Sequence, residues 1–99
     1  MMSPDMQRLA RIYDYCVRIE KTIARYGESF EVYDSDVDFQ QSIAFSILQI
    51  GELSGKLSPE YRKATSKRVQ WGPMKAMRNW FVHNYGDMDK TIIWETATT

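Results

Sequence analysis

The chain has 99 residues, 43% of them hydrophobic, and therefore the size of one small globular domain over residues 1–99. Its net charge is zero, and its one cysteine, Cys16, and one histidine, His83, exclude an intramolecular disulfide and a zinc site of three or four ligands. With no apolar run for a membrane span and no signal-peptide pattern, we expect a cytoplasmic protein without metal or cofactor.

A first helix is predicted from about Ser3 to Tyr26. Ser3 can cap its N-terminus, Pro4 suits the first turn, and Gly27 can end it. Apolar residues recur at alternating steps of three and four and form one stripe, which predicts a buried face: Leu9, Ile12, Cys16, Ile19, Ile23 and Tyr26.

The stretch "ESFEVYDSD", residues 28–36, is expected to be a loop. Asp34, Ser35 or Asp36 can cap the second helix that follows. Within that helix the segment "IAFSILQI" is apolar nearly all round, which predicts the central and most buried helix. One side of the helix carries Phe39, Ile43, Ile47, Ile50, Leu53 and Leu57.

Two further main helices and a short one are expected in the second half. Ser58, Pro59 and Glu60 predict the start of a short helix, and "SKRVQWGP" is expected to be a linker ending at Pro73. A helix "MKAMRNWFVHNY" follows, Gly86 ends it, and "DKTIIWETATT" starts a last helix. Because no segment shows a strand period, the fold predicted is an all-α bundle, antiparallel, with four to five helices.

Charge is distributed unevenly along the chain. Residues 27–55 contain six acidic residues and no Lys or Arg, whereas residues 56–78 contain seven basic residues and one acid, Glu60. Such asymmetry can mark a face that binds an anion or a partner. The alternative is that the two segments are neighbours and neutralise each other.

The segment "RNWFVHNYG", residues 78–86, holds the only histidine. Its apolar residues are typical of a core helix, and a single histidine there can be a structural hydrogen-bonding residue. On a regular helix Arg78 and His83 lie about 140° apart, whereas Asn79 shares a face with His83 and Tyr85 lies almost in line with Arg78. Arg78 and His83 therefore meet only if the arginine wraps round, the helix distorts, or two subunits contribute.

A two-fold dimer would suit the cleavage of RNA through its own 2′-hydroxyl. That reaction needs a base, an acid and a cation that stabilises the charged phosphorane-like transition state. One chain has one imidazole, but a dimer has two, together with two Arg78 guanidinium groups that can bind phosphate.

The spacing Arg78, His83, Tyr85 (R-x4-H-x-Y) resembles that of the HepT-like toxins of the HEPN superfamily. The flanking segments "IGELSGKLSPEYR", "MRNWFVHNY" and "YGDMDKTIIWET" reinforce the resemblance, which runs from about residue 43 to residue 96. Members of this family usually have a fuller final helix, so the final helix is expected to be shortened here.

The resemblance implies a HEPN-type helical bundle that acts as a homodimeric, metal-independent endoribonuclease. Arg78 and His83 would be catalytic, with Asn79 and Glu52 as supporting residues. The protein would be the toxin of a type II/VII-like toxin–antitoxin system. Its partner would be an MNT-type nucleotidyltransferase antitoxin, which would neutralise it by transferring AMP to Tyr85.

Several alternatives remain open at this stage. Glu52 can instead be an ion-pair partner, and Tyr85 can pack against the last helix. The protein can also be a non-catalytic helical module that holds the nucleotidyltransferase, or a purely structural dimer. The Arg78, His83 and Tyr85 set favours the ribonuclease over the structural dimer, but it does not distinguish the ribonuclease from the binding module.

Overall fold

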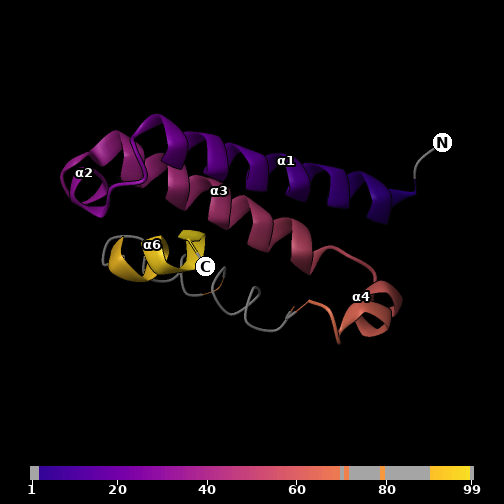
Figure 1. Cartoon of the computed structure of the whole chain (residues 1–99). Coiled ribbons are helices and arrows are strands. Elements are labelled where there is room, and N and C mark those ends of the chain that lie inside the picture. Colours follow the sequence, from indigo (N-terminus) through magenta and orange to yellow (C-terminus); the bar gives the residue numbers. More distant parts are fainter. Residues whose placement is uncertain (1–2, 70, 72–78, 80–89, 99) are drawn as a thin grey trace.

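The computed structural model describes residues 3–69, 71, 79 and 90–98. These residues form five α-helices and no strand, so the predicted all-α fold is confirmed: α1 (Pro4–Arg25), α2 (Phe30–Ser35), α3 (Val37–Gly55), α4 (Pro59–Thr65) and α6 (Lys90–Thr98). Helices α1 and α3 lie side by side and run in opposite directions (Figure 1). Helix α2 connects them at one end and α4 lies at the other, while α6 packs on α3 near α2.

The ends of α1 and α3 follow the capping signals in the sequence. The Ser3 hydroxyl accepts a 3.1 Å hydrogen bond from the Met6 amide, as predicted for the N-cap of α1. Gly27, with φ +78°, ends that helix, and its amide bonds the Ala24 carbonyl at 3.1 Å. Among the three candidate caps for α3, Asp36 takes the role, and its carboxylate accepts from the Phe39 amide at 3.0 Å.

The loop predicted for residues 28–36 is wrong, because α2 forms within it. Ser29 caps α2, and its hydroxyl accepts from the Val32 amide at 3.3 Å. Tyr33 anchors the helix because its side chain is fully buried. A helix of six residues shows hardly two turns of periodicity, and isolated helices of that length are unstable, so tertiary burial decides its formation.

An aromatic cluster joins α2, α3 and α6 to the end of α1. The Tyr26 and Phe39 rings stack with centroids 4.2 Å apart, and the Tyr33 and Trp94 rings lie 4.9 Å apart. Phe30 meets the edge of Trp94 at 5.8 Å. Since α3 packs against α1, α2 and α6, the prediction that it is the central helix is confirmed. The buried core around this cluster consists of Ile19, Tyr33, Phe39, Ile43, Ala44, Ile47 and Ile93.

Burial along α1 and α3 is uneven, although α3 has the most buried residues among the described helices, as predicted. Of the α1 stripe only Ile19 is buried, and Cys16 is exposed. The α3 segment is not buried all round, because Phe45 has 53% of its surface exposed. The physical reason is that, among the described residues, α1 and α6 pack against two sides of α3. The side of α3 that carries Phe45 is left exposed.

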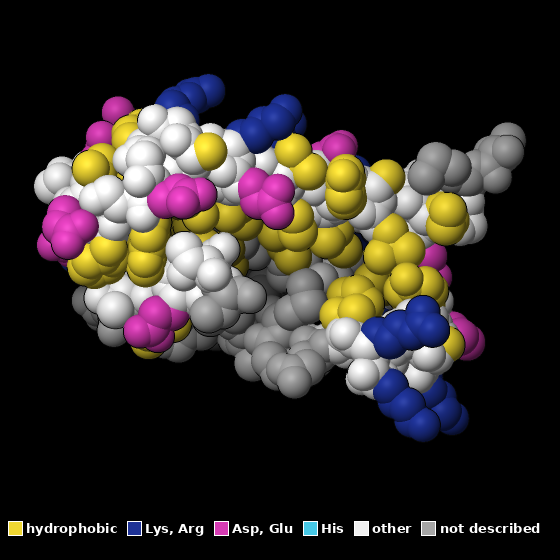
Figure 2. Space-filling view, viewed as in Figure 1, with side chains coloured by type: hydrophobic (Ala, Val, Ile, Leu, Met, Phe, Trp, Pro, Cys, Tyr) yellow, Lys and Arg dark blue, Asp and Glu magenta, His cyan; other side chains and the backbone are white. Residues whose placement is uncertain are grey.

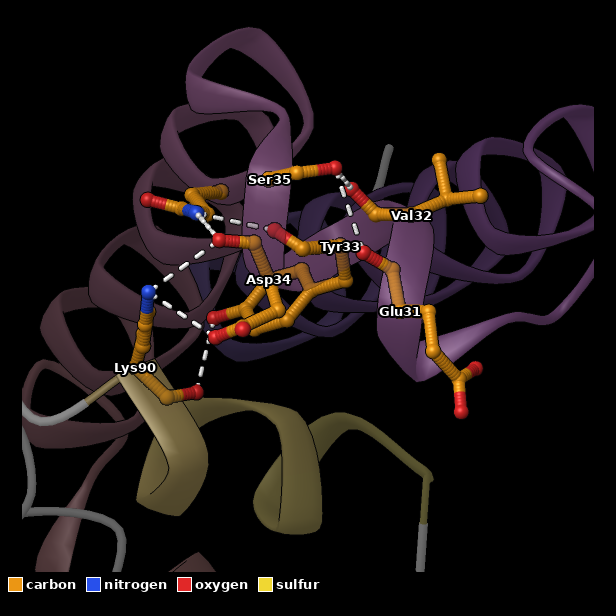
Figure 3. Close-up of polar contacts among 7 residues, drawn as sticks. Glu31, Val32, Tyr33, Asp34, Ser35 and Lys90 are labelled. Carbon is orange, nitrogen blue, oxygen red and sulfur yellow. Dashed lines mark hydrogen bonds and ion pairs between the residues drawn. The ribbon is translucent and has the colours of Figure 1, made fainter.

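Polar contacts attach α6 to α2 (Figure 3). The Tyr33 hydroxyl donates to the Lys90 carbonyl at 2.8 Å, and the Lys90 ammonium lies 2.8 Å from an Asp34 carboxylate oxygen. From the first turns of α3, the Gln40 amide donates to the Tyr33 and Asp34 carbonyls at 2.8 and 3.1 Å. These bonds satisfy carbonyls at the C-terminal end of α2 that have no partner within the helix.

Candidate functional site

Two of the predicted site residues lie in the described part of the chain. Glu52 is half-buried on α3 between the buried Gly51 and Leu53, and Asn79 is half-buried with helical backbone. Arg78, His83 and Tyr85 lie outside the described residues, as does most of the predicted helix at 74–85. The roles of all five residues therefore stay predictions from the sequence.

The chain before the motif is anchored to α4. The Trp71 indole donates a 2.9 Å hydrogen bond to the Thr65 hydroxyl, and its ring lies 6.3 Å from that of Tyr61. Trp71, the sixth residue of the predicted linker 66–73, has helical backbone, so the linker prediction is wrong at this residue. The aromatic and polar contacts of Trp71 explain the difference, because they hold this residue against the preceding helix.

Helix α4 is in turn fixed to the start of α1. The two carboxylate oxygens of Asp5 accept hydrogen bonds from the Ser58 amide at 2.9 Å and the Ser58 hydroxyl at 2.6 Å. These bonds, with a smaller contribution from the Arg8 charge, hold the pKa of Asp5 below its ordinary value of 3.8. The Ser58 hydroxyl also caps α4, since it accepts from the Tyr61 amide at 3.2 Å, which confirms its predicted role.

The chain after the motif is anchored at the opposite end of α3. Lys90, the first residue of α6, is bonded to Tyr33 and Asp34 of α2. Figure 1 shows α4 beyond one end of α3 and α6 beside its other end. The residues that flank the predicted catalytic segment are thus held at two separate ends of the central helix.

The predicted charge asymmetry is also a separation in space. Glu31 and Asp34 lie on α2, Asp36 caps α3 and Asp38 lies in its first turn, whereas Arg62 and Lys63 belong to the last turn of α4. Figure 2 shows Lys and Arg side chains gathered over α4. Asp34 pairs with Lys90 rather than with the basic segment. Among the described residues, the acidic side chains of α2 and the basic side chains of α4 therefore lie at opposite ends of α3.

A hollow of about 250 Å³ between α1 and α3 was not predicted from the sequence. Three cations of α1 line it, together with an exposed ring and hydroxyl groups from α3: Arg18, Lys21, Arg25, Ser42, Phe45 and Ser46. The sequence signal for this hollow was the spacing of Arg18 and Arg25. These residues are seven apart, and residues at that spacing share a helix face.

Within the described residues, no helix has the length and apolar character needed to cross a bilayer. In the same residues, no three His, Cys, Asp or Glu side chains are grouped as metal ligands.

The sequence was compared with known families and proteins. The sequence model of the ribonuclease HepT-like family matches residues 12–99, a range that contains every predicted site residue. The chain belongs to the ribonuclease HepT-like family. It is also 36% identical over 70 residues to a protein named "Putative RNase" from Caldanaerobacter subterraneus subsp. tengcongensis. The alignment covers 71% of this chain and 62% of that relative, less than two thirds of its length. No solved structure is significantly similar to the chain.

Proposed function

We propose that this member of the HepT-like family is an endoribonuclease that cleaves RNA without a metal ion. The family match over residues 12–99 carries the proposal, because it includes the Arg78 and His83 pair at the R-x4-H spacing. The name of the Caldanaerobacter relative supports the same activity. RNA, rather than DNA, is the proposed substrate because the chemistry uses the 2′-hydroxyl.

In the proposed reaction the 2′-oxygen attacks the adjacent phosphorus and the bond to the 5′-oxygen breaks. His83 of one subunit accepts the 2′-hydroxyl proton, and the imidazolium of the other subunit donates a proton to the leaving 5′-oxygen. The Arg78 guanidinium stabilises the extra negative charge on the phosphoryl oxygens. The products are a 2′,3′-cyclic phosphate and a free 5′-hydroxyl, so protons and bonds balance.

The proposed mechanism needs a homodimer, because each chain supplies one imidazole. Exposed apolar side chains on α1 support association: Met6 is 53% exposed and Tyr13 68% exposed. Figure 2 shows hydrophobic side chains along the length of α1 on the viewed face. Burial of such a surface would add to a core that is small for a single chain.

Regulation by a nucleotidyltransferase antitoxin belongs to the same proposal. AMP attached to the Tyr85 oxygen would put a phosphate and an adenosine on the line of helix that also carries Arg78. The phosphate would compete with RNA for the guanidinium, and the adenosine would block the cleft between the subunits. The proposed system is a cytoplasmic toxin and its modifying antitoxin.

The decisive experiment incubates the purified protein with end-labelled RNA in excess EDTA. We expect cleavage by the wild-type protein, and at least a 10²- to 10³-fold slower reaction for His83→Ala and Arg78→Ala, the usual effect of losing a transition-state contact. Circular dichroism checks that both variants stay helical. Equal cleavage by His83→Ala would refute the catalytic role. Absence of cleavage by the wild-type protein, with binding to a nucleotidyltransferase retained, would favour the non-catalytic module.

A mixed dimer tests the shared site. In the proposed mechanism both imidazoles are needed, so a heterodimer of one wild-type and one His83→Ala subunit lacks either the acid or the base. When the two proteins are mixed and allowed to exchange subunits, cleavage that falls with the square of the wild-type fraction, rather than in proportion to it, supports a site built by both subunits. Sedimentation that finds only monomers at micromolar concentration would contradict it.

A further inference from the structure

The hollow between α1 and α3 has three cations whose side chains carry no ion pair within the described part of the chain. Arg18, Lys21 and Arg25 are exposed, and no described carboxylate forms a salt bridge with them. The Arg18 guanidinium instead lies 5.2 Å from the centre of the Tyr15 ring. Three unpaired cations around a concave surface attract a polyanion.

An exposed aromatic ring lies on the α3 side of the same hollow. Phe45 is 53% exposed although it belongs to the central helix, and its ring meets the Tyr15 ring edge to face at 6.2 Å. Tyr15 therefore supports one edge of Phe45 while much of the Phe45 surface is left open to solvent. An open ring of this kind can stack on a nucleobase, since every base has a π-face.

From these contacts we propose that the α1–α3 groove, lined by Arg18, Lys21, Arg25 and Phe45, binds a single-stranded segment of RNA outside the catalytic motif. The proposal rests on the ribonuclease function proposed above, because it assigns the groove to the RNA substrate. Cations would hold the phosphates, and Phe45 would stack on a base. The Thr22 and Ser42 hydroxyls, which also line the hollow, can bond sugar or phosphate oxygens.

The dimensions of the groove suit a few nucleotides. Arg18 and Arg25 are seven residues apart, about 10.5 Å along the axis of α1. A stacked strand rises about 3.4 Å per nucleotide, so this distance spans about three nucleotides. The hollow of about 250 Å³ is smaller than most ligand pockets, which is consistent with a base and its phosphate lying partly in solvent.

An acidic partner protein is the competing occupant of the groove. The exposed Phe45 ring favours single-stranded RNA over such a protein. Cations alone would serve an acidic peptide equally well, whereas an unstacked ring beside spaced cations is the pattern of sequence-tolerant binding to single strands. A second copy of the chain is a further possibility, since Phe45 is an exposed apolar group. The test below distinguishes these occupants.

The test measures the affinity of a fluorescein-labelled single-stranded RNA for the His83→Ala protein, which binds without cleaving. Phe45→Ala in this background should weaken binding about 5- to 100-fold, the usual effect of losing one stacking contact. Arg18→Gln with Arg25→Gln removes two phosphate contacts, so the slope of log affinity against log salt should become shallower by about 1.4.

Matched variants serve as controls. Val37→Ala removes apolar surface from a side chain that is 60% exposed at the start of α3 but does not line the hollow. Lys63→Gln with Lys67→Gln removes two exposed charges at α4. We expect both to leave the affinity within about twofold and the salt slope less altered than the arginine pair does. If the control variants lose as much RNA affinity as the groove variants, net charge or general hydrophobicity explains the binding. That result would overturn the proposal that the groove binds RNA.

Two other results would also overturn the proposal. One is unchanged RNA affinity in Phe45→Ala and in the arginine pair; if the wild-type protein still cleaves RNA, the proposed function stands and only the groove is wrong. The other is dissociation of a dimer by Phe45→Ala in sedimentation, which would make this face a subunit interface. Conversely, groove-dependent binding by a wild-type protein that does not cleave RNA would refute the catalytic function but support the groove.

Discussion

The Tyr33 hydroxyl donates a hydrogen bond of 2.8 Å to the backbone carbonyl of Lys90, which is 57 residues further along the chain. Tyr33 is fully buried, and its ring packs on Trp94 of α6 at 4.9 Å. One side chain of a helix of six residues thus fixes the start of α6 by a polar bond and its body by ring contact. Lys90 lies four residues after the end of the predicted catalytic segment, residues 78–86.

Tyr33→Phe is expected to lower the free energy of unfolding by about 0.5–1.5 kcal/mol, because the ring stays but the part-buried hydrogen bond to the Lys90 carbonyl is lost. For a domain of this size the melting temperature should fall by several degrees. Thermal unfolding followed by circular dichroism measures the change. Tyr13→Phe, at an exposed position, is the control and should have almost no effect. Equal melting temperatures for Tyr33→Phe and the wild type would show that the hydroxyl contributes nothing.

Asp5→Ala is expected to destabilise the protein at pH 7 and to have little effect in acid. The folded-state pKa of Asp5 lies below its ordinary value of 3.8, chiefly through its hydrogen bonds from Ser58. Its stabilising contribution is therefore fully present above that value and is lost as the pH falls through the lower folded pKa. Melting curves from pH 7 to pH 2 should show the wild type and the variant converging.

Asp14→Ala is the control for this titration, since Asp14 is an exposed acid of the same helix. It should leave the melting temperature at pH 7 nearly unchanged. Ser58→Ala tests the other partner and should cost about 1 kcal/mol or more, because it removes the cap of α4 as well as the bond to Asp5. A difference in melting temperature between the wild type and Asp5→Ala that persists at pH 2 would contradict the link between the titration of Asp5 and stability.

Cys16 is expected to react slowly with iodoacetamide in spite of its exposure. Partial burial, and then the nearby Glu20 carboxylate, raise the pKa of its thiol above the ordinary value of 9.0. Less thiolate is therefore present at pH 8 in the folded protein than in the urea-unfolded chain, and alkylation should be slower. Glu20→Gln should restore only part of the rate, and Glu28→Gln should not change it. Faster alkylation of the folded protein would refute this account.

Tyr85 is expected to be the residue that a cognate nucleotidyltransferase modifies. Co-expression should add AMP-sized mass increments to the peptide that contains Tyr85, with loss of RNA cleavage by the modified protein. Tyr85→Phe should abolish both the increments and the inhibition, whereas Tyr13→Phe should keep them. Increments that persist in Tyr85→Phe would move the modification site elsewhere.

Much of the fold could be predicted because local chemistry decides it. Ser3, Asp36 and Ser58 cap their helices because a short side-chain oxygen reaches the free amides of the first turn. The choice of Asp36 over Asp34 and Ser35 needed tertiary information, since α2 extends as far as Ser35 and places its carbonyls within reach of Gln40. The family match over residues 12–99 and the R-x4-H spacing that the range contains are likewise properties of the sequence alone.

The tertiary structure decided which apolar residues are buried. Periodicity predicts that a face is apolar but not how much of it a neighbour covers, so Cys16 of the α1 stripe and Phe45 of the apolar α3 segment are both exposed. The same limit hid the groove, because Arg18 and Phe45 are 27 residues apart and only the pairing of α1 with α3 brings them to one hollow. Sequence by itself determined the starts of α1 and α4, through contacts within one turn, and the family, through a match over residues 12–99. Tertiary packing determined α2, the attachment of α6 and the basic groove, because each depends on residues that are distant along the chain.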